Sequence, residues 1–172
     1  MKYWNKLLPV LLSLLLIFAL ASSSCGAKYQ NDVTLGALFT AALEKAPVEG
    51  GYLTSEDDYI AMNFPADARA TLTENMADFR RDYSAVESDM NELLIVRTAE
   101  GKSVKAVREA VQKYFDKQVK FLEDNARLYS QTELGKIKAA KVTVYGNYVV
   151  MTVFDSAATG AVLSAIESAL KI

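Results

Sequence analysis

The residue whose type and setting point most clearly to a chemistry is Cys25, the only cysteine among 172 residues. It follows a run of three serines, and residues 7–20 before that run are uncharged and rich in leucine. Lys2 and Lys6 precede the apolar stretch. A basic, an apolar and a small-residue segment in this order are typical of a secretory signal. The apolar stretch is 14 residues long, whereas a membrane-spanning helix needs ~20, so we expect export rather than a permanent transmembrane anchor.

The residues around Cys25 resemble a bacterial lipobox, with the sequence Ser23-Ser24-Cys25-Gly26. In that pattern the cysteine receives a diacylglyceryl group and becomes the first residue of the mature protein. One difference is Ser22, which stands where the pattern usually has leucine. Two acyl chains anchor a protein stably, whereas one gives marginal binding. The resemblance implies a signal peptide at residues 1–24, a lipid on Cys25, and a location on the extracytoplasmic face of the cell membrane.

Several residue types that enzymes rely on are missing. The sequence has no histidine, which excludes Ser-His-Asp and Cys-His catalysis and ordinary histidine-ligated metal sites. A single cysteine cannot form an intramolecular disulfide, and here we assign it to the lipid. No glycine-rich phosphate loop occurs. The sequence therefore favours a protein that is not an enzyme, and we expect no cofactor and no metal.

Two short motifs suggest a chemistry, but each has a simpler structural explanation. Ser168 and Lys171 match the Ser-x-x-Lys string of penicillin-recognising enzymes, yet the companion Lys-Thr-Gly is absent. Residues 56–58, Glu-Asp-Asp, offer oxygen ligands for Ca²⁺ but lack the alternating spacing of a calcium loop. Acids at a helix N-terminus also complement the helix dipole. We interpret the first motif as a helix end and the second as a helix start.

The charge of the chain argues against nucleic acid as a partner. The sequence has 19 basic and 21 acidic residues, and removing Lys2 and Lys6 with the signal leaves 17 against 21, a net charge of −4. Nucleic-acid binding would call for a basic stripe. The expected partners are the membrane, through the lipid on Cys25, and an unknown protein or component of the cell envelope. The remaining 148 residues suit one domain.

After a tether at residues 25–32, the patterning predicts a domain over residues 33–172. Apolar residues at helical spacing predict helices near residues 33–46, 55–62, 104–126 and 156–170, with short helical turns near 71–79 and 130–134. Residues rich in β-branched and aromatic types predict strands at 83–87, 93–98, 142–145 and 148–154. Gly146-Asn147 predicts a two-residue hairpin turn that pairs Tyr145 with Tyr148.

Two hairpins joined by a long helix predict an α+β fold, an antiparallel four-stranded sheet with helices packed on one face. The register of the second hairpin assigns its side chains to two faces. One face carries Val142, Val144, Val149, Met151 and Val153, and we expect it to be the core.

The opposite face of this hairpin, with Tyr145, Tyr148, Val150 and Phe154, is too apolar to be fully wetted. One interpretation is a binding platform for a protein, a peptide or a wall glycan. The other is that the N-terminal helices cover this face as a second core layer. Those helices must bury their own apolar sides, which favours the second interpretation. The covering residues would be Leu38, Phe39, Leu43 and Tyr59.

Several segments together resemble a family of small lipoproteins of Gram-positive bacteria grouped as domain of unknown function four-three-five-eight. The resemblance lies in Cys25, the strand at residues 92–96 after a turn, the long charged helix ending near Tyr129, and the Gly-Asn-Tyr-Val-Val segment at 146–150. The family has no assigned activity or catalytic residues, so the resemblance implies none.

The function expected from the sequence is a membrane-anchored extracytoplasmic lipoprotein that acts as a non-catalytic protein- or envelope-binding module. One alternative is a carboxylate-dependent envelope hydrolase, which needs two acids facing each other across roughly 5–10 Å. Another is a small-molecule-binding lipoprotein with a pocket between sheet and helices. An exposed aromatic face would favour the binding module. Acids that converge in a pocket would favour the hydrolase.

Overall fold

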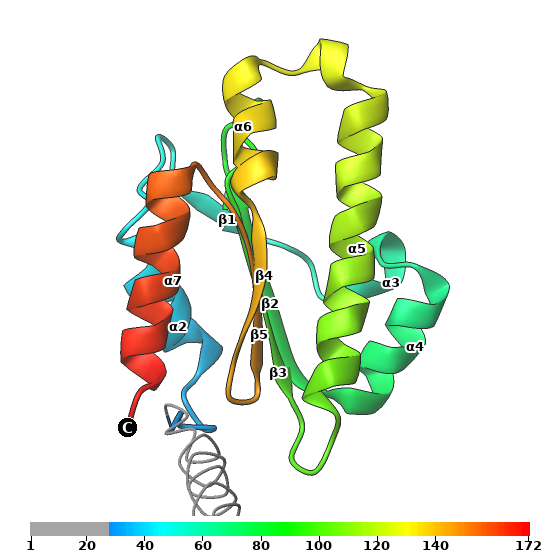
Figure 1. The fold of residues 1–172 in the computed structure, drawn as a ribbon, viewed down its shortest axis with the longest axis vertical. Coiled ribbons are helices and arrows are strands. Elements are labelled where there is room, and N and C mark those ends of the chain that lie inside the picture. The colour runs from blue at the N-terminus through cyan, green and yellow to red at the C-terminus, as the bar shows by residue number, and fades with distance from the viewer. Residues whose placement is uncertain (1–27) are drawn as a thin grey trace, which may run out of the picture.

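The computed structural model describes residues 28–172, so the predicted signal peptide and Cys25 lie outside the described residues (Figure 1). Its centre is a five-stranded antiparallel sheet in the order β1-β2-β3-β5-β4. The strands are β1 Tyr52–Thr54, β2 Met76–Ser84, β3 Glu92–Thr98, β4 Lys141–Tyr145 and β5 Tyr148–Val153. The predicted α+β class is confirmed, with a fifth strand, β1, that the sequence did not reveal.

Helices cover both faces of the sheet, not one face alone, which agrees with the favoured interpretation that N-terminal helices cover the aromatic side of the second hairpin. The helices are α2 Leu35–Leu43, α3 Tyr59–Asn63, α4 Ala66–Asn75, α5 Val104–Asp124, α6 Gln131–Ala139 and α7 Ser156–Leu170, with a 3₁₀ turn η1 at Ala126–Leu128. Figure 1 shows α2 and α7 on one side of the sheet and α3, α4 and α5 on the other. The central strands explain this, because every residue of β5 and four consecutive residues of β3, Leu93–Val96, are buried. A strand that is apolar on both sides needs cover on both sides.

Local sequence sets where most of these helices begin. A side-chain oxygen of the N-cap residue accepts a backbone N–H at the start of α2, α5, α6 and α7, as capping requires. The four caps are Thr34, Ser103, Ser130 and Asp155. Among residues 28–172, no helix combines the length and apolar character needed to cross a bilayer.

The segment before the first hairpin differs from its prediction. Residues 71–79 were expected to form a helical turn, but α4 ends at Asn75 and β2 begins at Met76. Pro65 ends α3 and starts α4, because its fixed φ suits the start of a helix and its missing N–H is not needed there. The side chain of Asn75 donates to the Thr71 carbonyl at 2.8 Å, at the end of α4.

The second hairpin has the predicted register. Tyr145 pairs with Tyr148 and Val144 with Val149, and Gly146 takes the left-handed conformation with φ 57°. Val149, Met151 and Val153 pack against α4 and α5, as expected for the core face.

The face proposed as a binding platform is buried. Tyr145 is 8 % exposed, and Tyr148, Val150 and Phe154 have no exposed surface. Because α2 and α7 both lie on this face, the four side chains belong to a second core with Leu38 and Phe39. An exposed platform is therefore wrong for this structure. Tyr59 packs in the core on the other face instead of here.

Candidate functional site

The C-terminal half of α5, α6 and the sheet enclose a cavity of about 230 Å³, called here the α5–α6 cavity. Its origin is a mismatch of lengths. The 21 residues of α5 span ~31 Å, whereas the seven residues of β3 span ~23 Å. The last turns of α5 thus extend past the end of the sheet, and η1 and α6 return as an arch (Figure 1). The space under the arch is the cavity.

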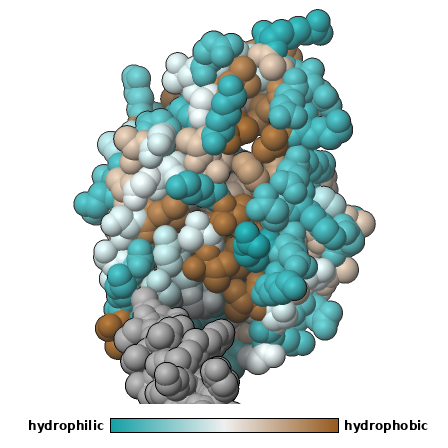
Figure 2. Space-filling model, in the orientation of Figure 1, coloured by the Kyte–Doolittle hydropathy of each residue, from teal (hydrophilic) through white to brown (hydrophobic). Residues whose placement is uncertain are grey.

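Apolar side chains form most of its walls. They come from the β2–β3 loop, α5, α6 and β5, namely Met90, Phe115, Phe121, Leu122, Ile137, Met151 and Val153. Figure 2 shows hydrophobic surface bordering the hollow between α5 and α6. Phe121 lies at the rim, where 55 % of its surface is exposed. A concave site with apolar walls and few polar groups is the usual form of a small-molecule site.

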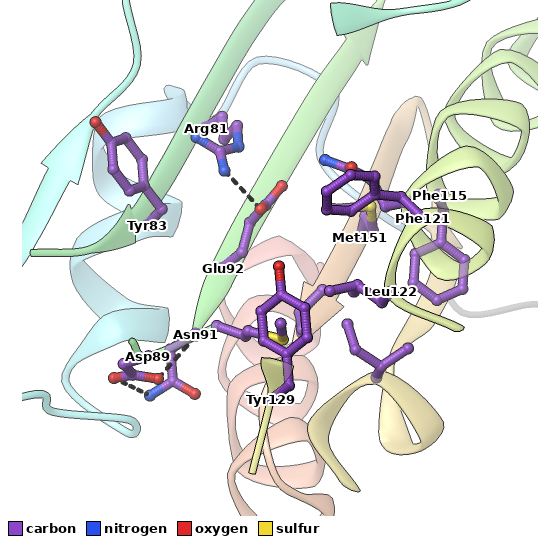
Figure 3. A pocket seen from close by; sticks show the side chains of 14 residues that line it. Arg81, Tyr83, Asp89, Asn91, Glu92, Phe115, Phe121, Leu122, Tyr129 and Met151 are labelled. Carbon is purple, nitrogen blue, oxygen red and sulfur yellow. Dashed lines mark hydrogen bonds and ion pairs between the residues drawn. The ribbon is translucent and has the colours of Figure 1, made fainter. Parts of the chain in front are cut away.

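A buried ion pair stands on the sheet side of the cavity (Figure 3). The Nη2 of Arg81, on β2, lies 2.7 Å from a carboxylate oxygen of Glu92, on β3, and both side chains are nearly nine-tenths buried. The guanidinium also lies over the rings of Tyr59 and Tyr83, at 4.4 and 4.5 Å from their centres. Ring faces attract a cation, so Arg81 is held in one position.

A phenol and an amide complete the surroundings of Glu92. The Tyr114 hydroxyl donates to Glu92 Oε1 at 3.4 Å and accepts from Gln118 Nε2 at 2.8 Å. Burial, and then the charge of Glu92, raise the pKa of Tyr114, so its hydroxyl stays protonated. Burial alone would lower the pKa of Arg81, but its hydrogen bond to Glu92 raises that pKa above the ordinary value. The site therefore holds a permanently charged guanidinium.

One donor of Arg81 is unused. Its Nε is buried and has no hydrogen-bond partner within residues 28–172. An unpaired buried donor is costly, since the group has lost its water without a replacement. Arg81 also lines a hollow of about 390 Å³ beside β1, so its side chain borders two concave regions.

A second ionic cluster fixes the arch to the sheet. Lys136 of α6 pairs with Asp89 in the β2–β3 loop and lies 2.9 Å from Glu133. Glu133 in turn accepts from the Met90 N–H at 2.8 Å, and Asp89 accepts from the Asn91 N–H at 3.0 Å. These bonds join α6 to the loop and set the width of the cavity.

The motifs weighed in the sequence do not meet in this site. Ser168, on α7, and Lys171, directly after it, are both exposed, and Lys171 pairs with Glu167 at 3.1 Å. Residues 56–58 are exposed before α3, and no cluster of three acids suited to a metal occurs among residues 28–172. Sequence reasoning passed over Arg81 and Glu92. Arg81 precedes the strand predicted at 83–87 and Glu92 precedes the one predicted at 93–98, so no predicted strand pairing placed the two charges side by side.

The molecule is thus an α+β domain with a central antiparallel sheet, helices on both faces and one cavity-forming arch. Residues 72–154, just under half of the chain, match the family described as Domain of unknown function (DUF4358). The family expected from the sequence is confirmed over these residues. They contain every residue that lines the α5–α6 cavity, while α2 and α7 lie outside the match. No curated protein and no solved structure matches the chain.

Proposed function

We propose that the protein is a lipid-anchored extracytoplasmic binding protein that takes a small molecule into the α5–α6 cavity. The ligand would have an apolar body and a polar group that accepts hydrogen bonds. The observation that carries this proposal is the combination of apolar walls with a single fixed guanidinium, Arg81, that retains an unpaired donor.

The physical basis is pre-organisation. Arg81 is held by Glu92 and two aromatic rings before any ligand arrives, so little side-chain freedom is lost on binding. The apolar walls supply affinity through buried surface. The volume of about 230 Å³ lies below the usual range for ligand sites, ~300–1,000 Å³, which favours a compact ligand.

An envelope hydrolase has less support from this geometry. Such an enzyme needs one carboxyl group as acid and another as base or nucleophile. The two carboxylates that line the cavity are Glu92 and Asp89, and each is engaged by a cation, Arg81 or Lys136. A protein-binding platform on the β4–β5 hairpin loses its support because those residues are buried.

The anchor is tested by replacing its attachment residue. Cys25→Ala removes the only sulfur in the sequence that can carry the acyl group, so the protein should be released from isolated membranes into the soluble fraction. Immunoblots of both fractions measure this. Retention of the variant on membranes would show that the uncleaved apolar segment is the anchor.

Ligand binding is tested by filling the cavity. Leu122 lines it and Leu128 does not, although both lie at the same end of the molecule. We expect 4-phenylbutyrate, an apolar body with one carboxylate, to bind the wild type, and Leu122→Trp to weaken binding at least tenfold in calorimetric titrations. Leu128→Trp, the matched control, should bind as the wild type does.

Thermal unfolding shows whether each variant is folded. If Leu122→Trp does not fold, Ile137→Trp fills the cavity from the α6 side. Equal affinity in the wild type, the filled variant and the control would contradict the proposed site.

A further inference from the structure

A second concave region lies at the opposite end of the molecule, beside the tether. The β3–α5 loop, the β4–β5 turn and the segment after residue 28 surround a hollow of about 740 Å³, called here the tether-side hollow. Its polar lining includes Asp32, Arg97, Thr98, Glu100, Lys102 and Asn147.

The first described residues are fixed to this end of the domain. The Gln30 N–H donates to the Leu170 carbonyl at 2.8 Å, and the Tyr29 ring packs edge-on against Tyr145 with 5.7 Å between the ring centres. Only Gly26 and Ala27 lie between Cys25 and Lys28, and the three steps from Cys25 to Lys28 span at most ~10 Å. A lipid on Cys25 would therefore keep the tether-side hollow close to the bilayer surface.

Three residues that line the tether-side hollow carry buried polar atoms without a partner. Arg97 Nε, Thr98 Oγ1 and Asn147 Oδ1 are buried and make no hydrogen bond within residues 28–172. Thr98 is only 2 % exposed, so its hydroxyl has little access to bulk water. The nearest acid to Arg97 is Asp78, at 3.9 Å. Buried polar atoms without a partner are uncommon, and three of them belong to residues that line this one hollow.

The charges of the tether-side hollow are mixed. Arg97 and Lys102 bring two cations, and Asp32 and Glu100 bring two carboxylates. The N-terminus of α5 opens here too, with Val104 in the lining. The partial positive charge of a helix start favours phosphate. A ligand with one anionic and one cationic group suits this lining better than a simple anion.

We infer that the tether-side hollow binds the phosphoethanolamine headgroup of a phospholipid, so that this end of the domain rests on the bilayer. The phosphate meets Arg97, Lys102 and the start of α5, while the ammonium meets the carboxylates of Asp32 and Glu100. This inference rests on the lipid anchor that we propose at Cys25.

A consequence for the α5–α6 cavity follows from the length of α5. Val104 lines the tether-side hollow and Phe121 lines the cavity. Phe121 follows Val104 by 17 positions on α5, a rise of ~26 Å. If the end of the domain with the tether-side hollow lies on the bilayer, the α5–α6 cavity faces away from the bilayer. The cavity then receives its ligand from the aqueous side of the envelope.

Fluorescence quenching tests the orientation. An acylated Cys25 leaves no free thiol in the wild type, so a new cysteine can be labelled alone with bimane. In phosphatidylethanolamine-containing vesicles with nitroxide headgroups, a label at Lys105→Cys, beside the tether-side hollow, should be quenched severalfold more than one at Leu128→Cys, at the far end. Equal quenching, or stronger quenching at Leu128→Cys, would overturn the orientation.

The same samples separate this result from a failure of the anchor. If the anchor is absent, the protein does not float with the vesicles in a density gradient. Quenching is therefore measured only on protein that floats. If that protein is not quenched more at Lys105→Cys than at Leu128→Cys, the orientation is contradicted while the anchor is not.

The headgroup itself is tested with O-phosphoethanolamine in NMR titrations of the full mature protein. We expect saturable binding that Arg97→Gln and Lys102→Gln each weaken at least tenfold. Lys120→Gln removes a charge on exposed α5 surface and should change nothing. Inorganic phosphate binding as tightly as O-phosphoethanolamine, or unchanged affinity in both hollow variants, would refute the assignment.

Discussion

At the residue scale, Arg81 and Glu92 depend on each other because both charges are nearly out of water. Removing one partner of a buried pair leaves the other uncompensated, which typically costs ~3–5 kcal/mol. We expect Arg81→Met and Glu92→Gln each to lower the free energy of unfolding by about that amount. The double variant should lose less than the two losses added together. Urea denaturation of all four proteins measures this, and strictly additive losses would contradict the pairing.

Asp89 gives the arch a dependence on pH. Burial alone would raise the pKa of Asp89, but hydrogen bonds from Lys136 and from the Asn91 N–H lower it below the ordinary value. A carboxyl with a lowered folded pKa stabilises the protein above its unfolded pKa of ~3.9, and this stability is lost as the pH falls through the folded pKa. We expect exchange of the α6 amides to accelerate below pH ~4. Asp89→Asn should remove this acid dependence, and an unchanged profile would contradict the role of Asp89.

At the element scale, the β4–β5 turn requires glycine. Gly146 has φ 57°, and a Cβ there would lie 3.0 Å from Tyr29 Cβ. Left-handed backbone costs an alanine ~1–2 kcal/mol, and crowding against Tyr29 adds to that, so Gly146→Ala should destabilise the protein. A Cβ added at Gly160, inside α7, would meet no atom within 4 Å, so Gly160→Ala should stabilise the protein by ~0.5–1 kcal/mol. The melting temperatures of the two variants should shift in opposite directions, and shifts of one sign would contradict this explanation.

The sequence could predict those elements whose chemistry is local. Gly146-Asn147 and the apolar stripe of α5 marked a hairpin and a helix correctly. β1 has only three residues, which is too short for the alternation of apolar and polar residues in a strand to be recognised. The first part of β2 was missed because Arg80 and Arg81 look like solvent-exposed residues, whereas tertiary ion pairs and aromatic rings bury much of their length.

The candidate site was less predictable than the fold. Sequence periodicity shows that Phe115 and Leu122 lie on the apolar side of α5, but not that the sheet ends beneath them. The α5–α6 cavity exists because α5 is longer than the strands it covers, which is a tertiary property. The mutual position of Arg81 and Glu92 likewise depends on the register between β2 and β3.

At the scale of the whole molecule, the family match and the folding unit differ in extent. Residues 72–154 exclude α2 and α7, which bury Tyr148, Val150 and Phe154 on one face of the sheet. An exposed apolar face of this kind causes association. We expect residues 72–154 alone to aggregate, while residues 28–172 stay monomeric on size-exclusion chromatography. A monomeric, cooperatively unfolding 72–154 fragment would show that the second core is dispensable.

The central claim, that the α5–α6 cavity holds a small ligand, can be tested with the methionine methyl groups. Of the four methionines in residues 28–172, Met90 and Met151 line the cavity. Met62 is exposed on α3, and Met76 lies beside the hollow next to β1. With ¹³C-methyl methionine, 4-phenylbutyrate should shift the NMR signals of Met90 and Met151 and leave those of Met62 and Met76 unchanged. Saturating shifts at Met62 or Met76, with Met90 and Met151 unmoved, would contradict the account.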